Sequence, residues 1–260
     1  MNKTALITGA SSGIGLELAR YFAREGHNVI VIARRNGRLQ TLKKEIESHF
    51  KVSATVMSLD LTEHDAPIRI RDALLDANIH IDFLVNNAGF GSIGEFPRIA
   101  WDKQAKMIDL NVRVLTELTH LFIPMMIEKK SGKILNLAST ASFQPGPNMA
   151  VYFATKAYVL SFSEALAQEL AGTGITVTAS CPGPTITEFQ STAGVSRHNA
   201  FMNNRYLPHA KDVAEFSYKS MMKGKRVAVH GNFNQVLAST VGLVPRTAVT
   251  KITHWLTKQF

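Results

Sequence analysis

Short runs of apolar, often β-branched residues alternate along this chain with longer stretches in which apolar residues recur every three or four positions. The first two runs are Ala5–Thr8 and Val29–Ile32, and a stretch of helical periodicity, Leu16–Arg24, lies between them. Continuous apolar runs of this length are typical of strands buried on both faces, and helical stretches between them predict βαβ units. Similar runs predict further strands at residues 54–58, 82–86, 133–138, 175–181 and 226–230.

This alternation predicts the fold class α/β, with a doubly wound parallel sheet of about seven strands and helices on both faces. The chain has 260 residues, of which 45% are hydrophobic, so it can bury one large core and we expect a single domain. Clusters of glycine and proline follow strands at residues 89–94, 144–147 and 182–184. Because ligands bind beyond the carboxyl ends of strands in open α/β sheets, these clusters predict the loops of a binding site.

A glycine-rich turn, TGASSGIG at residues 8–15, follows the first strand and opens the first helix. Its small residues let a phosphate approach the backbone, and the helix N-terminus supplies amide donors. In the first βα unit of a parallel sheet, this placement predicts a dinucleotide site and a Rossmann-type fold. The candidate binding residues are Gly9, Ser11, Ser12, Gly13, Ile14 and Gly15. The alternative interpretation is an ordinary tight turn without a ligand.

Two arginines, Arg34 and Arg35, end the second strand, where an NAD site carries an acidic residue for the ribose hydroxyls. A guanidinium there can bind a 2′-phosphate through charge-assisted hydrogen bonds, so the pair predicts NADP (NADPH) as the cofactor. The alternative is two solvated arginines at the start of a surface helix.

Tyr152 and Lys156 are four residues apart in a stretch of helical character, so both side chains project from one helix face. A neighbouring ammonium stabilises a phenolate and lowers the pKa of the tyrosine, which would suit it for proton transfer. Ser139, just past the fifth strand, can hydrogen-bond a substrate carbonyl. Tyr-x-x-x-Lys alone also occurs by chance, as a packed tyrosine beside a surface lysine.

These motifs together resemble the short-chain dehydrogenase/reductase family, and the arginine pair resembles its NADP-preferring branch. TGASSGIG, NNAG at residues 86–89, Asn111, Ser139 and YxxxK occur in the family order, and the resemblance weakens only beyond residues 226–230. It implies an oxidoreductase that passes a hydride between nicotinamide and a carbonyl or secondary alcohol. It further implies a catalytic tetrad in which Tyr152 exchanges the proton, Lys156 lowers its pKa and holds the ribose, Ser139 orients the substrate oxygen and Asn111 anchors a relay water.

The resemblance also implies a set of cofactor contacts. Asp60 and Leu61 match the segment that contacts adenine, and Asn87, Ala88 and Gly89 match the segment beside the adenine ribose. The motif at Pro182 and Gly183 matches the nicotinamide side, where Ile186 and Thr187 would bind the carboxamide; the alternative is a loop that merely ends a strand. We therefore expect residues 1–231 to form the dinucleotide-binding and catalytic domain, with residues 232–260 as a basic helical extension packed on it.

Apolar side chains near the expected catalytic mouth predict a hydrophobic ketone or aldehyde as substrate: Phe90, Phe143, Met149, and Phe189, Phe201 and Met202 in the segment 189–209. Phe189, Phe201 and Met202 could equally pack a lid helix against the body.

The formal net charge is +9, and no acidic residue follows Glu215, so the C-terminal end is basic. There Ile252, Trp255 and Leu256 predict an amphipathic helix, which could rest weakly on an anionic membrane or dock on the domain or a sister subunit. We expect a homodimer or homotetramer, no metal, no nucleic acid because no groove-reading motif is present, and a cytoplasmic protein whose one cysteine, Cys181, is buried. An NADP(H)-sensing or interaction protein on the same fold is the alternative function.

Overall fold

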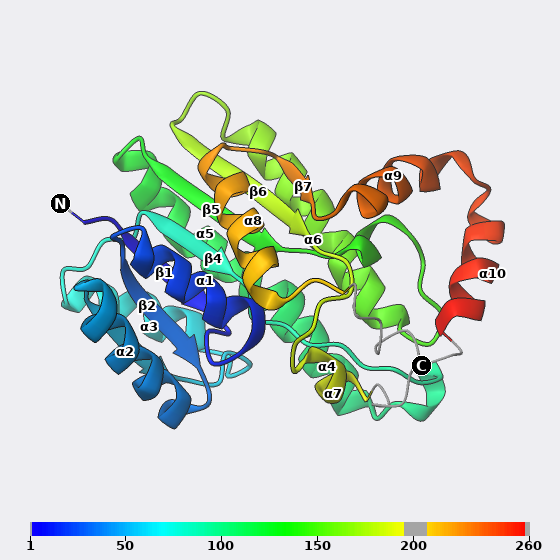
Figure 1. Ribbon diagram of the computed structural model, residues 1–260, viewed down its shortest axis with the longest axis horizontal. Coiled ribbons are helices and arrows are strands. Elements are labelled where there is room, and N and C mark those ends of the chain that lie inside the picture. The colour runs from blue at the N-terminus through cyan, green and yellow to red at the C-terminus, as the bar shows by residue number, and fades with distance from the viewer. Residues whose placement is uncertain (1, 195–206, 258–260) are drawn as a thin grey trace.

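The computed structural model describes residues 2–194 and 207–257. They contain a seven-stranded sheet in the order β3-β2-β1-β4-β5-β6-β7, in which every neighbouring pair is parallel (Figure 1). The strands are β1 (Thr4–Thr8), β2 (Asn28–Ala33), β3 (Ala54–Ser58), β4 (Phe83–Asn86), β5 (Gly132–Leu137), β6 (Ile175–Cys181) and β7 (Val227–Val229). All seven strands predicted from the sequence are confirmed, with small differences at their ends, and so is the fold class.

Helices cover both faces of the sheet. Those between β1 and β5 are α1 (Gly13–Arg24), α2 (Asn36–Phe50), α3 (Ala66–Asp76), η1 (Phe96–Arg98), α4 (Trp101–Ile108), the π-helical η2 (Asp109–Val114) and α5 (Leu115–Glu128). Those after β5 are η3 (Thr140–Phe143), α6 (Ala150–Glu169), α7 (Phe189–Ala193), α8 (Ala210–Met222), α9 (Asn232–Thr240), η4 (Val241–Leu243) and α10 (Arg246–Thr257).

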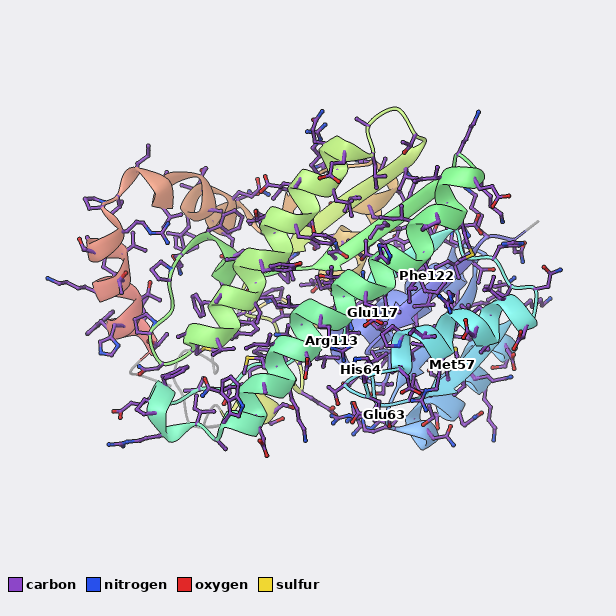
Figure 2. The ribbon with its side chains drawn as sticks, turned by 180° about the vertical axis from the view of Figure 1, so that it is seen from behind. Met57, Glu63, His64, Arg113, Glu117 and Phe122 are labelled. Carbon is purple, nitrogen blue, oxygen red and sulfur yellow. The ribbon has the colours of Figure 1, made fainter. Side chains whose placement is uncertain are left out.

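Two apolar layers hold this arrangement together, and β1 shows how the sequence creates them. Ala5 and Ile7 pack into the layer with α1, α2 and α8, whereas Leu6 between them packs into the layer with α3 and α5. Successive side chains of a strand point to opposite faces, so a strand covered on both sides needs a continuous apolar run. Figure 2 shows the second layer from behind, with Phe122 of α5 turned toward the sheet.

The strand order reverses beside β1, which pairs with β2 on one side and with β4 on the other. The chain therefore leaves the sheet in opposite directions from adjacent strands, and a crevice opens at their carboxyl ends. This edge carries the glycine-rich turn after β1 and the Asn86–Gly89 segment after β4, which brings the predicted cofactor motifs together.

Beyond β7 the chain forms an arm of α9, η4 and α10 that projects from the body (Figure 1). A helix is present where one was predicted around Ile252, as α10, but the face that it buries carries Val249, Thr253 and Thr257 and not the predicted apolar residues. Eight large apolar side chains of the arm are nevertheless exposed: Phe233, Val236, Leu237, Leu243, Val244, Ile252, Trp255 and Leu256. In the part of the chain that the structure describes, no helix is both long and apolar enough to cross a membrane.

Two residues named in the sequence predictions, Phe201 and Met202, lie outside the described residues. Cys181 is buried, as predicted, and burial raises the pKa of its thiol to about 12. Such a thiol stays protonated and unreactive near neutral pH.

Candidate active site

The glycine-rich turn is fixed between β2 and the segment after β4. Gly9 has a positive φ of 71° and donates its backbone N–H to the Ile32 carbonyl oxygen at 2.8 Å. The Asn87 amide donates to the Thr8 carbonyl oxygen at 2.9 Å, and the Asn87 and Ala88 backbone N–H groups both donate to the Thr8 hydroxyl at 3.0 Å. The two motifs after β1 and β4 are therefore one hydrogen-bonded unit.

Glycine at positions 9 and 15 is required by close contacts within this unit. A Cβ atom on Gly9 would lie 2.9 Å from the Ala88 Cα atom, and one on Gly15 would overlap the Asn87 side chain and the Gly9 carbonyl. The turn thus brings backbone close to backbone and leaves α1 beginning at Gly13 without an acidic residue in its first turn. A helix N-terminus of this kind favours a bound anion.

Arg35 connects the end of β2 to the glycine-rich turn. Its guanidinium donates to the Ser11 hydroxyl at 3.0 and 3.1 Å and to the Ser12 hydroxyl at 2.7 Å. A fourth hydrogen bond, of 2.7 Å, reaches the Glu188 carboxylate, whose other oxygen accepts a 2.6 Å bond from Arg38. The structure therefore gathers the cations and hydroxyls that a 2′-phosphate would need.

Arg34 does not share this cluster. Its side chain is 76% exposed and lies 4.0 Å from the Asp60 carboxylate, which also accepts two hydrogen bonds from Thr62. Asp60 and the buried Leu61 follow β3 at the carboxyl edge, beside the end of β2. The two arginines predicted as a pair thus diverge, Arg35 toward the glycine-rich turn and Arg34 toward the predicted adenine segment.

Glu188 and Arg38 were not predicted from the sequence. The hydrogen bonds from Arg38 and Arg35 lower the pKa of the Glu188 carboxyl to about 2, so it is charged throughout the neutral range. Arg38 lies one helical turn beyond Arg35, a spacing that could have pointed to it. Glu188 is separated from both arginines by about 150 residues of sequence, and its partners are fixed only by the fold.

Asn111 is held inside the protein by the π-helical segment η2. It is 1% exposed, accepts a hydrogen bond from the Phe90 backbone N–H at 3.1 Å, and donates to the Phe90 carbonyl at 3.0 Å and to the Thr155 hydroxyl at 3.1 Å. Single-turn π segments redirect one side chain out of the regular helical repeat and are frequent at functional sites. Here the segment ties the loop after β4 to α6.

Gly89 lies between Asn111 and Lys156. A Cβ atom at Gly89 would approach the Asn111 Oδ1 atom to 2.9 Å and the Lys156 Nζ atom to 3.6 Å. Two of the four predicted catalytic residues therefore meet at the backbone of the NNAG motif, and only glycine leaves both side chains where they are.

Tyr152 and Lys156 project from the first turns of α6, as the spacing predicts. Lys156 is 7% exposed, and its Nζ atom donates to the Leu137 carbonyl at 2.6 Å and lies 5.9 Å from the centre of the Tyr152 ring. Burial lowers the pKa of Lys156 to about 8, since a desolvated ammonium is less stable.

The pKa of Tyr152 moves in the direction opposite to the predicted one. Burial raises it to about 12, and a hydrogen bond with Ser139 offsets only part of this shift. The reason is geometric, because the Lys156 ammonium is directed to the end of β5 and desolvation outweighs its influence on the phenol. Ser139 in turn is fixed at the start of η3, where its hydroxyl accepts the Ala141 backbone N–H at 3.1 Å.

The Pro182–Thr187 segment leaves β6 and faces the glycine-rich turn. A Cβ atom on Gly13 would contact the Thr187 side chain at 3.3 Å, and a Cβ on Gly183 would lie 2.6 Å from the Asn234 amide of α9. The Ile186 backbone N–H donates to the Pro208 carbonyl at 3.0 Å. The Thr187 hydroxyl accepts a hydrogen bond from the Phe189 backbone N–H and donates one to the Gln190 side-chain oxygen. Gln190 was not predicted from the sequence.

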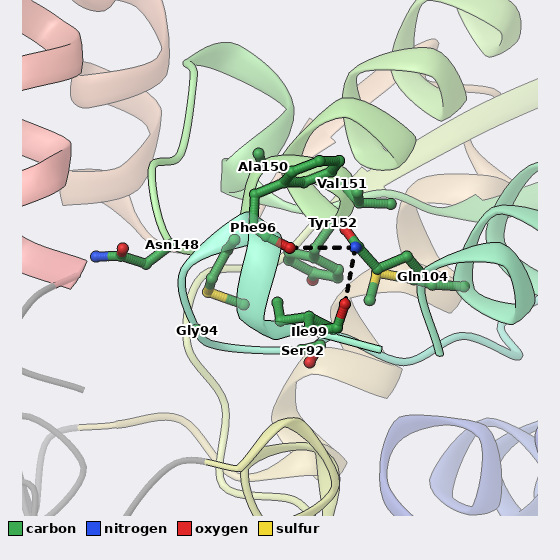
Figure 3. A pocket seen from close by; sticks show the side chains of 11 residues that line it. Ser92, Gly94, Phe96, Ile99, Gln104, Asn148, Ala150, Val151 and Tyr152 are labelled. Carbon is green, nitrogen blue, oxygen red and sulfur yellow. Dashed lines mark hydrogen bonds between the residues drawn. The ribbon is translucent and has the colours of Figure 1, made fainter. Parts of the chain in front are cut away.

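A pocket opens beside Tyr152, between η1, α4 and the loop that precedes α6 (Figure 3). Gln104 forms part of its wall and donates to the Phe96 and Ile99 carbonyls at 3.4 and 3.2 Å (Figure 3). The pocket is lined by Ser92, Gly94, Phe96, Ile99, Gln104, Met107, Asn148, Met149, Ala150, Val151 and Tyr152. Of the apolar residues predicted near the mouth, Met149 lines this pocket, and the Phe189 ring packs on Tyr152 at 5.3 Å. Phe143 instead lines a separate hollow between β7 and α9.

These residues fit a nicotinamide dinucleotide. The glycines at positions 9 and 15 leave backbone accessible where a Cβ would fill the turn, and Arg35 with two serines offers donors for a phosphate. The tyrosine, serine, lysine and asparagine follow along the same sheet edge. Among residues 2–194 and 207–257, no group of three or more His, Cys, Asp or Glu side chains could hold a metal ion.

Comparison with known proteins agrees with this geometry. Residues 3–197 match the short chain dehydrogenase family model. Serine 3-dehydrogenase of Agrobacterium fabrum is 40% identical over 190 residues, which cover 73% of this chain and 74% of that protein. A short-chain dehydrogenase from Sphingobium yanoikuyae in complex with NADPH superposes with a TM-score of 0.82 at 30% identity, over 93% of this chain and 94% of that one.

The structure of a bulky-bulky ketone specific alcohol dehydrogenase from Comamonas testosteroni is also similar. Its TM-score is 0.78 at 30% identity, and 93% of each chain is covered. Family match, relatives and fold therefore agree with the motifs along the sheet edge, and the chain belongs to the short-chain dehydrogenase/reductase family of oxidoreductases.

Proposed function

We propose that this protein is an NADP(H)-dependent oxidoreductase that interconverts a hydrophobic ketone or aldehyde and its alcohol. The observation that carries the proposal is the convergence of Tyr152, Ser139 and Lys156 beside the glycine-rich turn at one end of the sheet. When bound, the dinucleotide supplies or accepts the hydride.

In the reductive direction, Tyr152 gives its phenolic proton to the substrate oxygen. A phenol whose pKa is about 12 is protonated at neutral pH, so the proton to be transferred is present. Ser139, which acts on the pKa of Tyr152, orients the same oxygen and stabilises its developing negative charge.

Lys156 and Asn111 would position the cofactor ribose and the relay water, respectively. The Lys156 ammonium, anchored on Leu137, would hold the ribose of the nicotinamide half, and its positive charge would stabilise the phenolate left after proton transfer. Asn111 maintains the link between the loop after β4 and α6 through Phe90 and Thr155, and anchors a water of the proton relay.

The preference for NADP over NAD is supported by Arg35, whose guanidinium donates hydrogen bonds to Ser11 and Ser12. Arg38 adds a second positive charge there, since it binds the same Glu188 carboxylate as Arg35. Donors in this fork geometry suit a phosphate better than a ribose hydroxyl. The NADPH complex of the Sphingobium relative supports the same preference.

An apolar substrate group beside Tyr152 is supported by four side chains of the pocket lining, Phe96, Ile99, Met107 and Met149. The specificity for bulky ketones named for the Comamonas enzyme agrees with it. The related serine 3-dehydrogenase is named for a small polar substrate, so a carbonyl panel has to include both kinds.

We further propose a homo-oligomeric, cytoplasmic enzyme. The eight exposed apolar side chains of the arm support self-association, because isolated monomers seldom expose so many in one segment. The single, buried cysteine suits a reducing compartment. Sedimentation of the wild type and of a Phe233→Ser/Trp255→Ser double variant tests the assembly, and binding of the monomer to anionic vesicles would instead assign the arm to a membrane surface.

A parallel fluorescence titration with NADPH and NADH tests the proposed function without knowledge of the substrate. We expect NADPH to bind at least tenfold more tightly, and subsequent turnover of a bulky aldehyde or ketone. Preference for NADH would overturn the cofactor assignment, and failure to bind either dinucleotide would overturn the proposed function.

A further inference from the structure

Glu188 occupies the hydrogen-bond donors that a 2′-phosphate would use. One carboxylate oxygen accepts from Arg35 at 2.7 Å and the other from Arg38 at 2.6 Å. The same Arg35 guanidinium donates to Ser11 and Ser12, next to the first turn of α1. An acidic side chain thus lies on the cations of the candidate cofactor site.

Glu188 neutralises the two arginines of this candidate anion site, and a competing anion can break its ion pairs. The side chains of Arg35, Arg38 and Glu188 are each between 42% and 49% exposed, so water screens the ion pairs and they are weak. A phosphate carries more negative charge than a carboxylate and offers three oxygens to the same donors. It can therefore replace Glu188 on Arg35, whereas a ribose hydroxyl cannot.

Glu188 also lies at a junction in the chain. It follows directly on the Pro182–Thr187 segment and precedes α7, whose first residue, Phe189, packs its ring on Tyr152 at 5.3 Å. The far end of α7 is tied to the loop after β4, because the Ala193 carbonyl accepts the Ile93 backbone N–H at 3.0 Å. Glu188 on the cations and Phe189 on Tyr152 are therefore adjacent residues that link the two parts of the site.

We propose that Glu188 is a displaceable internal anion that competes with the 2′-phosphate of the cofactor for Arg35 and Arg38. This inference rests on the proposed NADP(H) function and adds a specificity-determining residue to it. Glu188 keeps other anions off the empty site, weakens NADP(H) binding enough for release, and couples occupancy of the phosphate site to α7. Its role is selective for the 2′-phosphate, because NADH brings no group that competes for these donors.

The test is a calorimetric titration of the wild type, Glu188→Gln and Glu188→Ala with four ligands: NADPH, NADH, 2′,5′-ADP and 5′-ADP. Glutamine keeps the size of the side chain and removes the charge, so we expect about 5- to 20-fold tighter binding of NADPH and 2′,5′-ADP in that variant. NADH and 5′-ADP should change less than twofold. Glu95→Gln is the matched control, since Glu95 forms an exposed 3.0 Å ion pair with Arg98 outside the cofactor site.

The outcomes separate this inference from the function on which it rests. If the wild type prefers NADPH and the Glu188 variants bind it equally or more weakly, the carboxylate orders the arginines instead of competing, and the inference is overturned while the function stands. If the wild type binds none of the four ligands, the proposed function fails and the inference fails with it. Tighter binding confined to the two ligands with a 2′-phosphate supports the competition.

Discussion

The Lys156 Nζ atom donates a 2.6 Å hydrogen bond to the carbonyl oxygen of Leu137, the last residue of β5. This bond fixes an almost fully buried ammonium between a strand end and α6, with Gly89 and Asn111 on its other side. The protein keeps a charge at a place where an apolar side chain would be more stable. A residue of this kind serves function while it lowers the free energy of unfolding, and this loss of stability can be measured.

Replacement of Lys156 by methionine should stabilise the protein near pH 7. Burial lowers the lysine pKa from 10.5 to about 8, which corresponds to about 3 kcal/mol of lost stability while both states are protonated. Loss of the hydrogen bond to Leu137 offsets about 1 kcal/mol, so we expect a net gain of about 2 kcal/mol by urea unfolding.

The stability advantage of Lys156→Met should decrease as the pH rises above 8. Below pH 8 the wild-type lysine is charged in both the folded and the unfolded chain, and the penalty is complete. Between pH 8 and 10.5 the folded state has lost its proton and the unfolded state has not, so wild-type stability rises and the advantage of Lys156→Met shrinks. Lys44→Met, at an exposed position of α2, is the control. An advantage that does not change with pH would contradict the assignment.

Arg35→Gln should weaken NADPH binding and leave NADH binding nearly unchanged. A charge-assisted hydrogen bond to a phosphate contributes about 1.5 to 3 kcal/mol, which is about 10- to 100-fold in Kd. Arg98→Gln removes a charge that is 79% exposed and remote from the site, and should change neither affinity. Equal loss for both dinucleotides in a fluorescence titration would mean that Arg35 binds something other than the 2′-phosphate.

The glycines at positions 15 and 37 offer a matched pair within the first turns of two helices. Gly15→Ala places a methyl group against Asn87 and the Gly9 backbone, whereas Gly37→Ala meets no atom within 4 Å. We expect Gly15→Ala to cost about 2 to 3 kcal/mol and to abolish dinucleotide binding, since the turn must deform. Gly37→Ala should gain about 0.5 to 1 kcal/mol. Similar melting temperatures for the two variants would contradict the close packing of the turn.

Local patterns in the sequence were enough to predict the sheet and the motifs that the structure brings together at its carboxyl edge. A strand covered on both faces leaves an unbroken apolar run such as Val29–Ile32, and the four-residue spacing of Tyr152 and Lys156 places them on one helix face. Both features depend only on neighbours in the chain.

Features that depend on distant partners were not predicted. The Glu188 carboxylate meets Arg35 across about 150 residues of sequence, and no local pattern marks it as part of a phosphate site. The π-helical turn that buries Asn111 also has no sequence period of its own. The pKa of Tyr152 is raised by burial, which the Tyr-x-x-x-Lys motif does not indicate.

The most direct test of the whole account is NADPH oxidation by the wild type and Tyr152→Phe with a panel of bulky ketones, aldehydes and small polar carbonyls. The phenyl ring keeps the packing on Phe189 and removes only the hydroxyl that bonds Ser139. We predict turnover of a bulky carbonyl by the wild type, a loss of about 10²- to 10⁴-fold in kcat in the variant, and NADPH affinity within twofold. Undiminished turnover by Tyr152→Phe would contradict proton transfer by this residue and, with it, the mechanism derived from the site.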